Sequence, residues 1–231
     1  MVLAICGLLA LSTDLCGQVR ADKLTLTKES DTTFWTIGYT PMIKRCELID
    51  PNDSIDFFRI SSPKYFLELS KKSNKMVLYV NEIWEDTQTD CYFSKSFELE
   101  LKQVVEIKKL IDSLDILLIP NDKFIEGWSH GFDGITYFIE NKMDSLYSFK
   151  SYWTPSAQTS LKEAKALSDF VDKRLDNIID YQSKKKLFER EIPFYGWAYN
   201  GSTTVTKVTS DTKAFRKYKK EKERQIKTPP K

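Results

Sequence analysis

Two alternating stretches on either side of a polar turn decide the fold: Ile135-Thr136-Tyr137-Phe138-Ile139 and Leu146-Tyr147-Ser148-Phe149. Apolar and polar side chains alternate in both, as expected for strands with one buried face. The residues between them include Asn141-Lys142-Met143-Asp144, which are polar apart from the Met. The spacing predicts a β-hairpin with a loop of about four to five residues.

Three segments before the hairpin also have the pattern of strands. Residues 76–80 are a continuous apolar run, which is typical of a central strand buried on both faces. Two other segments alternate, with apolar side chains at Tyr65, Leu67 and Leu69 in one and at Phe93, Phe97 and Leu99 in the other. The short connections between these segments favour antiparallel pairing.

Two segments have the period of an amphipathic helix instead. They cover residues 101–114 and 158–182, with apolar side chains at steps of three and four. Ser160 and Glu163 have the spacing of a capping box at the start of the second. Each helix must lay its apolar face on the sheet. The sequence therefore predicts an α+β fold, an antiparallel sheet with two main amphipathic helices packed on it.

The composition is that of a globular protein. The chain has 231 residues, of which 41% are hydrophobic and 29% charged, with a net charge of +2. An aromatic share of 13% supports a sizeable core and excludes disorder of the whole chain. We divide the chain into a signal peptide (1–21), an α+β domain (22–185), an aromatic-rich extension (186–212) and a basic tail, disordered or a frayed helix (213–231).

The N-terminus begins with a run of ten apolar residues, Val2 to Leu11. A membrane span needs about 20 residues, so the run has instead the length of the apolar part of a signal peptide. Small residues offer cleavage sites after Gly17 or Ala21. No Lys or Arg precedes the run, and the alternative is a buried N-terminal strand or helix. We expect an exported protein that is periplasmic, attached to the cell surface or secreted.

The cysteine count agrees with export. Removal of the signal peptide would take Cys6 and Cys16 and leave Cys46 and Cys91. In an oxidising compartment these two could form a disulfide. The alternative is two buried thiols that pack as small apolar side chains. The absence of any Cys-x-x-Cys motif excludes zinc-ribbon and thioredoxin-type sites.

The loop Trp128-Ser129-His130-Gly131-Phe132-Asp133-Gly134 contains the only His of the chain. His130 and Asp133, together with Glu140, form a candidate functional cluster for acid–base chemistry. The alternative, which we favour, is a glycine-containing turn in which Asp133 bonds to the backbone. The chain has no G-x-S-x-G, Walker A or H-E-x-x-H motif. We therefore assign no catalytic residue, no metal ligand and no cofactor.

Positive charge gathers at the C-terminus. Residues 213–231 carry nine basic and two acidic side chains. Such a segment fits an anionic envelope polymer or an anionic lipid surface. Phe215 and Tyr218, which lie between the cations, are also typical of single-strand binders, but an exported protein rarely meets nucleic acid, so we do not favour that partner. The simplest alternative is a solubilising tail.

The middle of the chain carries three short motifs in order. They are D-G-x-x-[WY]-x-[LI]-E at Asp133 to Glu140, a strand with Tyr147, and an aromatic-x-Pro corner at Trp153 to Pro155 that leads into a helix. This pattern resembles a group of uncharacterised exported bacterial proteins over about 45 of 231 residues. The group has no assigned activity, so the resemblance implies architecture and export but no reaction.

The expected function follows from these observations. We expect an exported protein that serves as a non-catalytic binding or structural module of the cell envelope. The alternative is a hydrolase that uses Asp133, Glu140 and His130. Convergence of the three side chains in one pocket would favour the enzyme, and their separation would favour the binding module.

Overall fold

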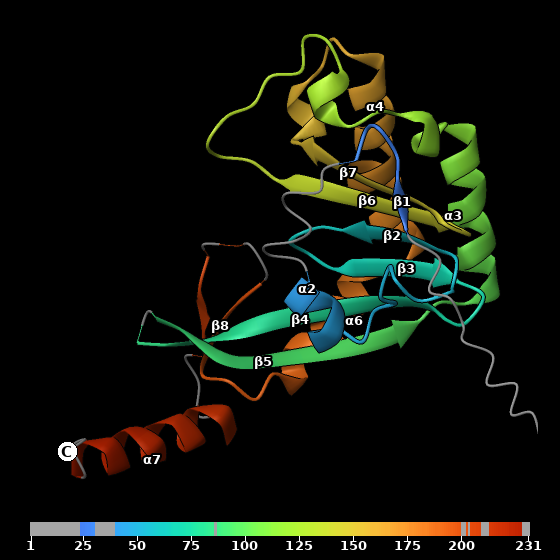
Figure 1. Ribbon diagram of the computed structural model, residues 1–231. Helices are drawn as coiled ribbons and strands as arrows, with labels where there is room; N and C mark the ends of the chain where they lie inside the picture. The colour runs from blue at the N-terminus through green and yellow to red at the C-terminus, as the bar shows by residue number, and fades with distance from the viewer. Residues whose placement is uncertain are drawn as a thin grey trace, which may run out of the picture.

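The computed structural model describes residues 24–30, 40–85, 87–199, 202, 204–208 and 213–227. In this part of the chain a large sheet has helices on both faces (Figure 1). The α+β class expected from the sequence fits this arrangement. The expected signal peptide at 1–21, with Cys6 and Cys16, lies outside the described residues.

The described residues contribute nine strands to the sheet. The strands are β1 (Thr25–Leu26), β2 (Phe57–Ser61), β3 (Phe66–Ser70), β4 (Asn74–Trp84), β5 (Thr87–Glu98), β6 (Thr136–Met143), β7 (Leu146–Trp153), β8 (Gly196–Tyr199) and β9 (Thr206–Lys207). Their order is β1-β7-β6-β2-β3-β4-β8-β9, and β5 also pairs with β4. The pairs are antiparallel, as predicted, except that β1 runs parallel to β7.

Strand β4 is the centre of the sheet. β5 pairs with β4 from Lys75 to Trp84. β3 pairs with the first half of β4 and β8 with the second half, which places both on the edge that β5 leaves open. Residues 76–80 are at most 2% exposed, so the prediction of a buried central strand is confirmed.

The hairpin is tighter than its sequence predicts. β6 and β7 pair up to Met143 and Leu146, so the loop is shorter than the expected four to five residues. Asp144 adopts a positive φ of 53° in this turn. Asn141 and Lys142, which we expected in the loop, remain in β6 because they pair with β2 and because the Lys142 ammonium donates to the Asp53 carbonyl. The ammonium of Lys142 is thus satisfied within the strand.

The two faces of the sheet carry cores of unequal size. The larger core lies under the long helices and includes Leu78, Ile107, Leu167 and Phe188. The smaller core lies under α2 and includes Cys46 and Tyr79. The α-helices are α2 (Thr40–Arg45), α3 (Leu101–Ser113), α4 (Lys162–Ser168), α5 (Leu175–Ile178), α6 (Tyr181–Glu191) and α7 (Lys213–Lys227), with short 3₁₀ turns at Ile116–Leu118, Asp122–Phe124 and Pro155–Ala157.

The prediction of two main helices is not confirmed. The first expected helix is present as α3, and its capping box is formed by Glu100 and Gln103. The second is divided: α4 passes through a π-helical stretch, Asp169–Arg174, into α5, and Asp180 in the left-handed conformation separates α5 from α6. Ser160 and Glu163 do not cap α4, which begins after Leu161.

The π-helical stretch has a reason in the sequence. The buried residues Leu167, Val171, Leu175 and Ile179 recur at steps of four and are at most 2% exposed. A regular α-helix has 3.6 residues per turn, so a strict step of four would rotate this stripe away from the sheet. The wider π turn offsets that rotation and keeps the stripe on the core.

Residues beyond 185 pack with the domain, and the described part of the tail is helical, one of the two states expected for it. Phe188 and Trp197 belong to the larger core, and β8 pairs with β4, so the expected extension is part of the sheet. Residues 213–227 form α7, which lies apart from the other helices at the lower left of Figure 1.

Candidate functional site

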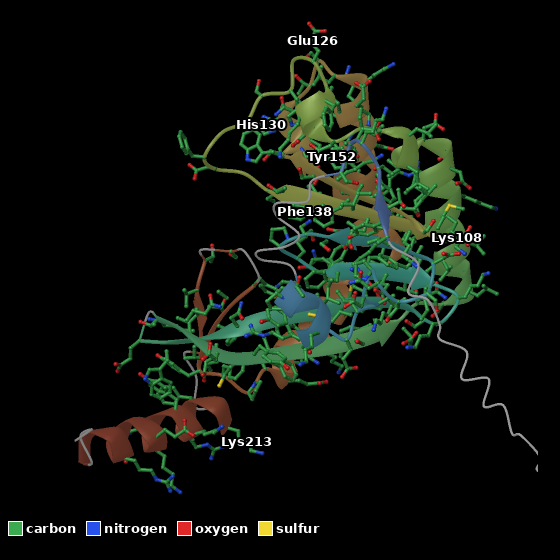
Figure 2. The ribbon with its side chains drawn as sticks, in the orientation of Figure 1. Lys108, Glu126, His130, Phe138, Tyr152 and Lys213 are labelled. Carbon is green, nitrogen blue, oxygen red and sulfur yellow. The ribbon has the colours of Figure 1, made fainter. Side chains whose placement is uncertain are left out.

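The structure does not bring the three candidate residues together. His130 and Asp133 lie in the loop before β6, where His130 is half exposed and Asp133 is exposed. Glu140 lies within β6 and has an exposed fraction of 0%. Figure 2 shows His130 on this loop, far from Lys213 on α7. The geometry therefore offers no shared acid–base site for His130, Asp133 and Glu140.

His130 has a different carboxylate partner. Its Nε2 lies 3.2 Å from Oδ2 of Asp122, which is 3% exposed. The same Oδ2 accepts the backbone N–H of Trp153 at 2.7 Å. Asp122 thus connects the loop to the end of β7, with His130 as its partner in the loop and Trp153 as its partner in the strand.

The glycines of the loop are required by the close approach of Trp153 and Thr154. A Cβ on Gly131 would lie 2.9 Å from the Trp153 ring, and one on Gly134 would lie 2.2 Å from Oγ1 of Thr154 and 2.6 Å from Nε1 of Trp153. The ring of Trp128 donates its N–H to the Trp153 carbonyl at 3.0 Å. The loop therefore wraps around Trp153, and its residue types are explained by packing.

A row of buried charges crosses three strands on the opposite face. Arg59 of β2 pairs directly with Glu68 of β3 on one side and with Glu140 of β6 on the other. The Arg59 Nη1 lies 3.0 Å from both oxygens of Glu140, and Nη2 lies 2.8 Å from Oε2 of Glu68. All three side chains have an exposed fraction of 0%. The three charges lie in register because the strands place them directly opposite one another.

The row extends to the segment that follows α2. Glu68 accepts the backbone N–H of Ile49 at 2.9 Å, and the Arg59 guanidinium donates to the Ile49 carbonyl. The Tyr147 hydroxyl donates to Glu140 at 2.6 Å, and the Lys75 ammonium lies 3.9 Å from Glu68. This closed network anchors the α2 segment to the sheet. Because it is sealed from solvent, we assign it to the fold and not to catalysis.

The sequence does contain a signal for this network, which we missed. In two of the three strands one charged residue lies between apolar neighbours, Arg59 between Phe58 and Ile60 and Glu68 between Leu67 and Leu69, and in the third strand Glu140 directly follows Ile139. An alternating strand normally has a polar face that is solvated. The same faces also carry Phe57, Phe66 and Phe138, which marks them as buried.

Lys150 is a second buried cation that could suggest chemistry. Its ammonium donates to the carbonyls of Leu117 and Ile119 at 2.9 and 2.8 Å. Burial lowers the pKa of Lys150. Both hydrogen bonds connect β7 to the 3₁₀ turn after α3, so the geometry assigns Lys150 a structural role.

Cys46 and Cys91, the two cysteines among the described residues, are free thiols, so the disulfide that the sequence left open is not formed. Cys46 is buried in the smaller core beside Tyr79, whereas Cys91 is exposed on β5. Tyr92, the residue after Cys91, is the one that faces this core, where its ring stacks 5.7 Å from the ring of Tyr79. The even cysteine count therefore reflects one buried and one exposed thiol.

Helix α7 is held to the domain by its aromatic side chains. Tyr218 stacks on Tyr195 at 4.0 Å and contacts Trp84 at 4.5 Å, and Phe215 contacts Tyr195 at 5.7 Å. Phe215 and Tyr218 are three residues apart, so they lie on one face of the helix. This aromatic face is the reason why the basic segment is helical and docked.

The cations of α7 remain exposed. The described basic side chains are Lys213, Arg216, Lys217, Lys219, Lys220 and Arg224, and each is exposed. Lys220 and Arg224 are four residues apart on the side of the helix away from Phe215 and Tyr218. Glu221 and Glu223 are the acidic residues of α7. The helix therefore presents a surface rich in positive charge on one side and an occupied aromatic face on the other.

Two features are absent from the described residues. In these residues no group of three His, Cys, Asp or Glu side chains could hold a metal ion. None of the helices formed by the same residues is long and apolar enough to cross a membrane. No family model, curated protein or solved structure matches the chain.

Proposed function

We propose that this is an exported, non-catalytic binding module of the cell envelope that holds an anionic polymer through α7. The observation that carries the proposal is the two-sided character of α7. Its aromatic side chains Phe215 and Tyr218 are docked on Tyr195 and Trp84, while its described cations are exposed. A docked helix presents its charges at fixed spacing without the entropy loss of ordering a free tail.

The docking favours a polymer over a lipid bilayer. A helix that lies in a membrane interface buries its apolar face among the acyl chains. In α7 the rings of Phe215 and Tyr218 are already packed against the domain. Contact with lipid would therefore be electrostatic only, whereas a chain of phosphates or carboxylates can follow Lys220 and Arg224 along the helix.

The test is binding to polyphosphate, a soluble phosphate polymer. The variant Lys219→Gln/Lys220→Gln/Arg224→Gln removes three exposed charges from α7 and leaves its aromatic contacts in place. Each charge contributes about 1 kcal/mol to the binding free energy, so we expect the affinity of the variant for polyphosphate to fall roughly 100-fold at low salt. Wild-type binding should weaken as NaCl is added, because salt screens exposed charges.

A matched control separates α7 from overall charge. The variant Lys102→Gln/Lys108→Gln/Lys109→Gln removes three exposed cations from another helix, α3. We expect this control to bind polyphosphate within about twofold of wild type, since those charges lie outside α7. Equal losses in the two variants would contradict the proposal. So would binding to vesicles of anionic lipid without any binding to polyphosphate.

A further inference from the structure

A cavity of about 640 Å³ lies where the end of α6, strand β8 and the start of α7 meet. Its apolar lining consists of Ile192, Pro193, Trp197 and Val208. Sites for small molecules are typically about 300–1,000 Å³ and mainly apolar, with a few polar groups that orient the ligand. This cavity has the size and the apolar lining of such a site.

The polar lining has an excess of positive charge. Arg190, Lys213 and Lys217 line the cavity together with Glu189 and Glu191. Both carboxylates already have cations from outside the cavity: Lys185 lies 2.5 Å from Glu189, and Lys95 lies 2.5 Å from Glu191. The acidic charges of the lining are therefore neutralised by neighbours.

The cations of the lining are not compensated in the same way. Among the described residues, Arg190 and Lys213 form no ion pair with a carboxylate. Lys217 has Glu221 at 3.9 Å, but both side chains are largely exposed, and such pairs contribute little. Lys213 lies at the start of α7 (Figure 2). The cavity thus offers three positive groups to a ligand.

Trp197 supplies an independent observation. It lines the cavity and is 6% exposed, and its indole N–H is buried without any hydrogen-bond partner. A buried donor that stays unsatisfied lowers the stability of the folded protein. An acceptor atom on a ligand would remove this penalty. This side of the cavity therefore favours a ligand that presents an oxygen atom.

We propose that this cavity binds an organic acid with an apolar body. The carboxylate or phosphate head faces Arg190, Lys213 and Lys217, and one of its oxygens accepts the Trp197 N–H. The apolar body lies against Ile192, Pro193 and Val208. This site is separate from the outward cations Lys219, Lys220 and Arg224, so it does not rest on the proposed polymer binding.

The test is calorimetric titration of the full chain with four small probes below their micelle concentrations. Octyl phosphate and octanoate combine an acid with an apolar chain and distinguish the two head groups. Inorganic phosphate has the charge alone, and octyl glucoside has the chain alone. We expect at least one of the two acids to bind at least about 10-fold more tightly than inorganic phosphate and octyl glucoside.

Two variants locate the site. Lys213→Gln/Lys217→Gln and Trp197→Phe should each weaken binding of the acid by about 10-fold. Lys219→Gln/Lys220→Gln, which removes two cations outside the cavity lining, should leave it unchanged within about twofold. Circular dichroism and retained polyphosphate binding check that Trp197→Phe is folded. Wild-type affinity for the acid in either cavity variant, or equal affinity for octyl glucoside and octyl phosphate, overturns the inference.

Discussion

Arg59 lies directly opposite Glu140 across the β2–β6 ladder, with its Nη1 3.0 Å from each carboxylate oxygen. On its other side Arg59 bonds to Glu68, so one guanidinium is shared by two buried carboxylates. Burying a charge is costly unless it is paired and hydrogen-bonded. The stability of the α2 side of the sheet therefore depends on one cation.

Replacement of this cation should be strongly destabilising. Arg59→Met leaves Glu68 and Glu140 buried without their shared partner, and we expect a loss of about 3–5 kcal/mol in the free energy of unfolding, measured by urea titration. Lys64→Met is the control. Its pair with Asp176 is partly exposed, so its loss should cost about 0–1 kcal/mol. A similar cost for the two variants would show that the buried row is dispensable.

The helical layer can be tested by a pair of leucines. Leu167 has an exposed fraction of 0%, whereas Leu101 is 79% exposed. Leu167→Ala should lower the free energy of unfolding by about 2–5 kcal/mol through lost contacts and a new cavity. Leu101→Ala should change it by no more than about 0.5 kcal/mol. A harmless Leu167→Ala in the urea titration would mean that α4 does not pack as described.

The loop before β6 depends on Asp122 more than on His130. Asp122→Ala removes the acceptor of the Trp153 N–H, which should cost about 1–3 kcal/mol. His130→Ala removes a half-exposed partner, and we expect a cost below about 1 kcal/mol. Thermal unfolding of the two variants shows which substitution destabilises the protein more. The reverse order would indicate that His130 contributes more than its pair with Asp122.

The two thiols should differ in reactivity. Burial raises the pKa of Cys46 from 9.0 to about 12, so this side chain is a neutral thiol at pH 8.5. Iodoacetamide reacts with thiolates. We expect it to modify the exposed Cys91 and to spare Cys46 until urea unfolds the protein, as read by mass spectrometry of peptides. Modification of Cys46 in the native protein at the rate of Cys91 would contradict its burial.

The raised pKa of Cys46 also makes the stability of the protein depend on pH. The unfolded chain releases the Cys46 proton near pH 9.0, whereas the folded chain keeps it to about pH 12. The contribution of this group is therefore fully present below pH 9 and is lost as the pH rises toward 12. Cys46→Ala should reduce the fall in urea midpoint between pH 9 and pH 11 relative to wild type.

Local patterns predicted the strands better than the helices. The apolar run at 76–80 and the alternation at Leu67 and Leu69 mark strands because side-chain direction follows directly from the backbone. The break at Asp180 could not be predicted in this way, because nothing in the local sequence marks an Asp that adopts the left-handed conformation. Propensity extends the helix through it, whereas in the structure a new helix begins after the break, with Tyr181 buried in the larger core.

The candidate site failed for a different reason. His130, Asp133 and Glu140 are close in sequence, but the strand carries Glu140 to the face under α2 while His130 stays in the loop. Proximity along the chain does not fix which face a strand residue takes. Local sequence patterns could not predict the docking of α7 either. It depends on Trp84 and Tyr195, which lie in other parts of the sequence.

The pairing of β8 with β4 also governs the order in which this protein can assemble. Ala198 pairs with Asn81, so the second half of the β4 edge has no partner until residues 196–199 have been synthesised. An unpaired edge is a template for strands of other molecules. Nascent or truncated chains that end before residue 196 should therefore aggregate, and a chaperone that shields this edge would serve the protein until β8 pairs with it.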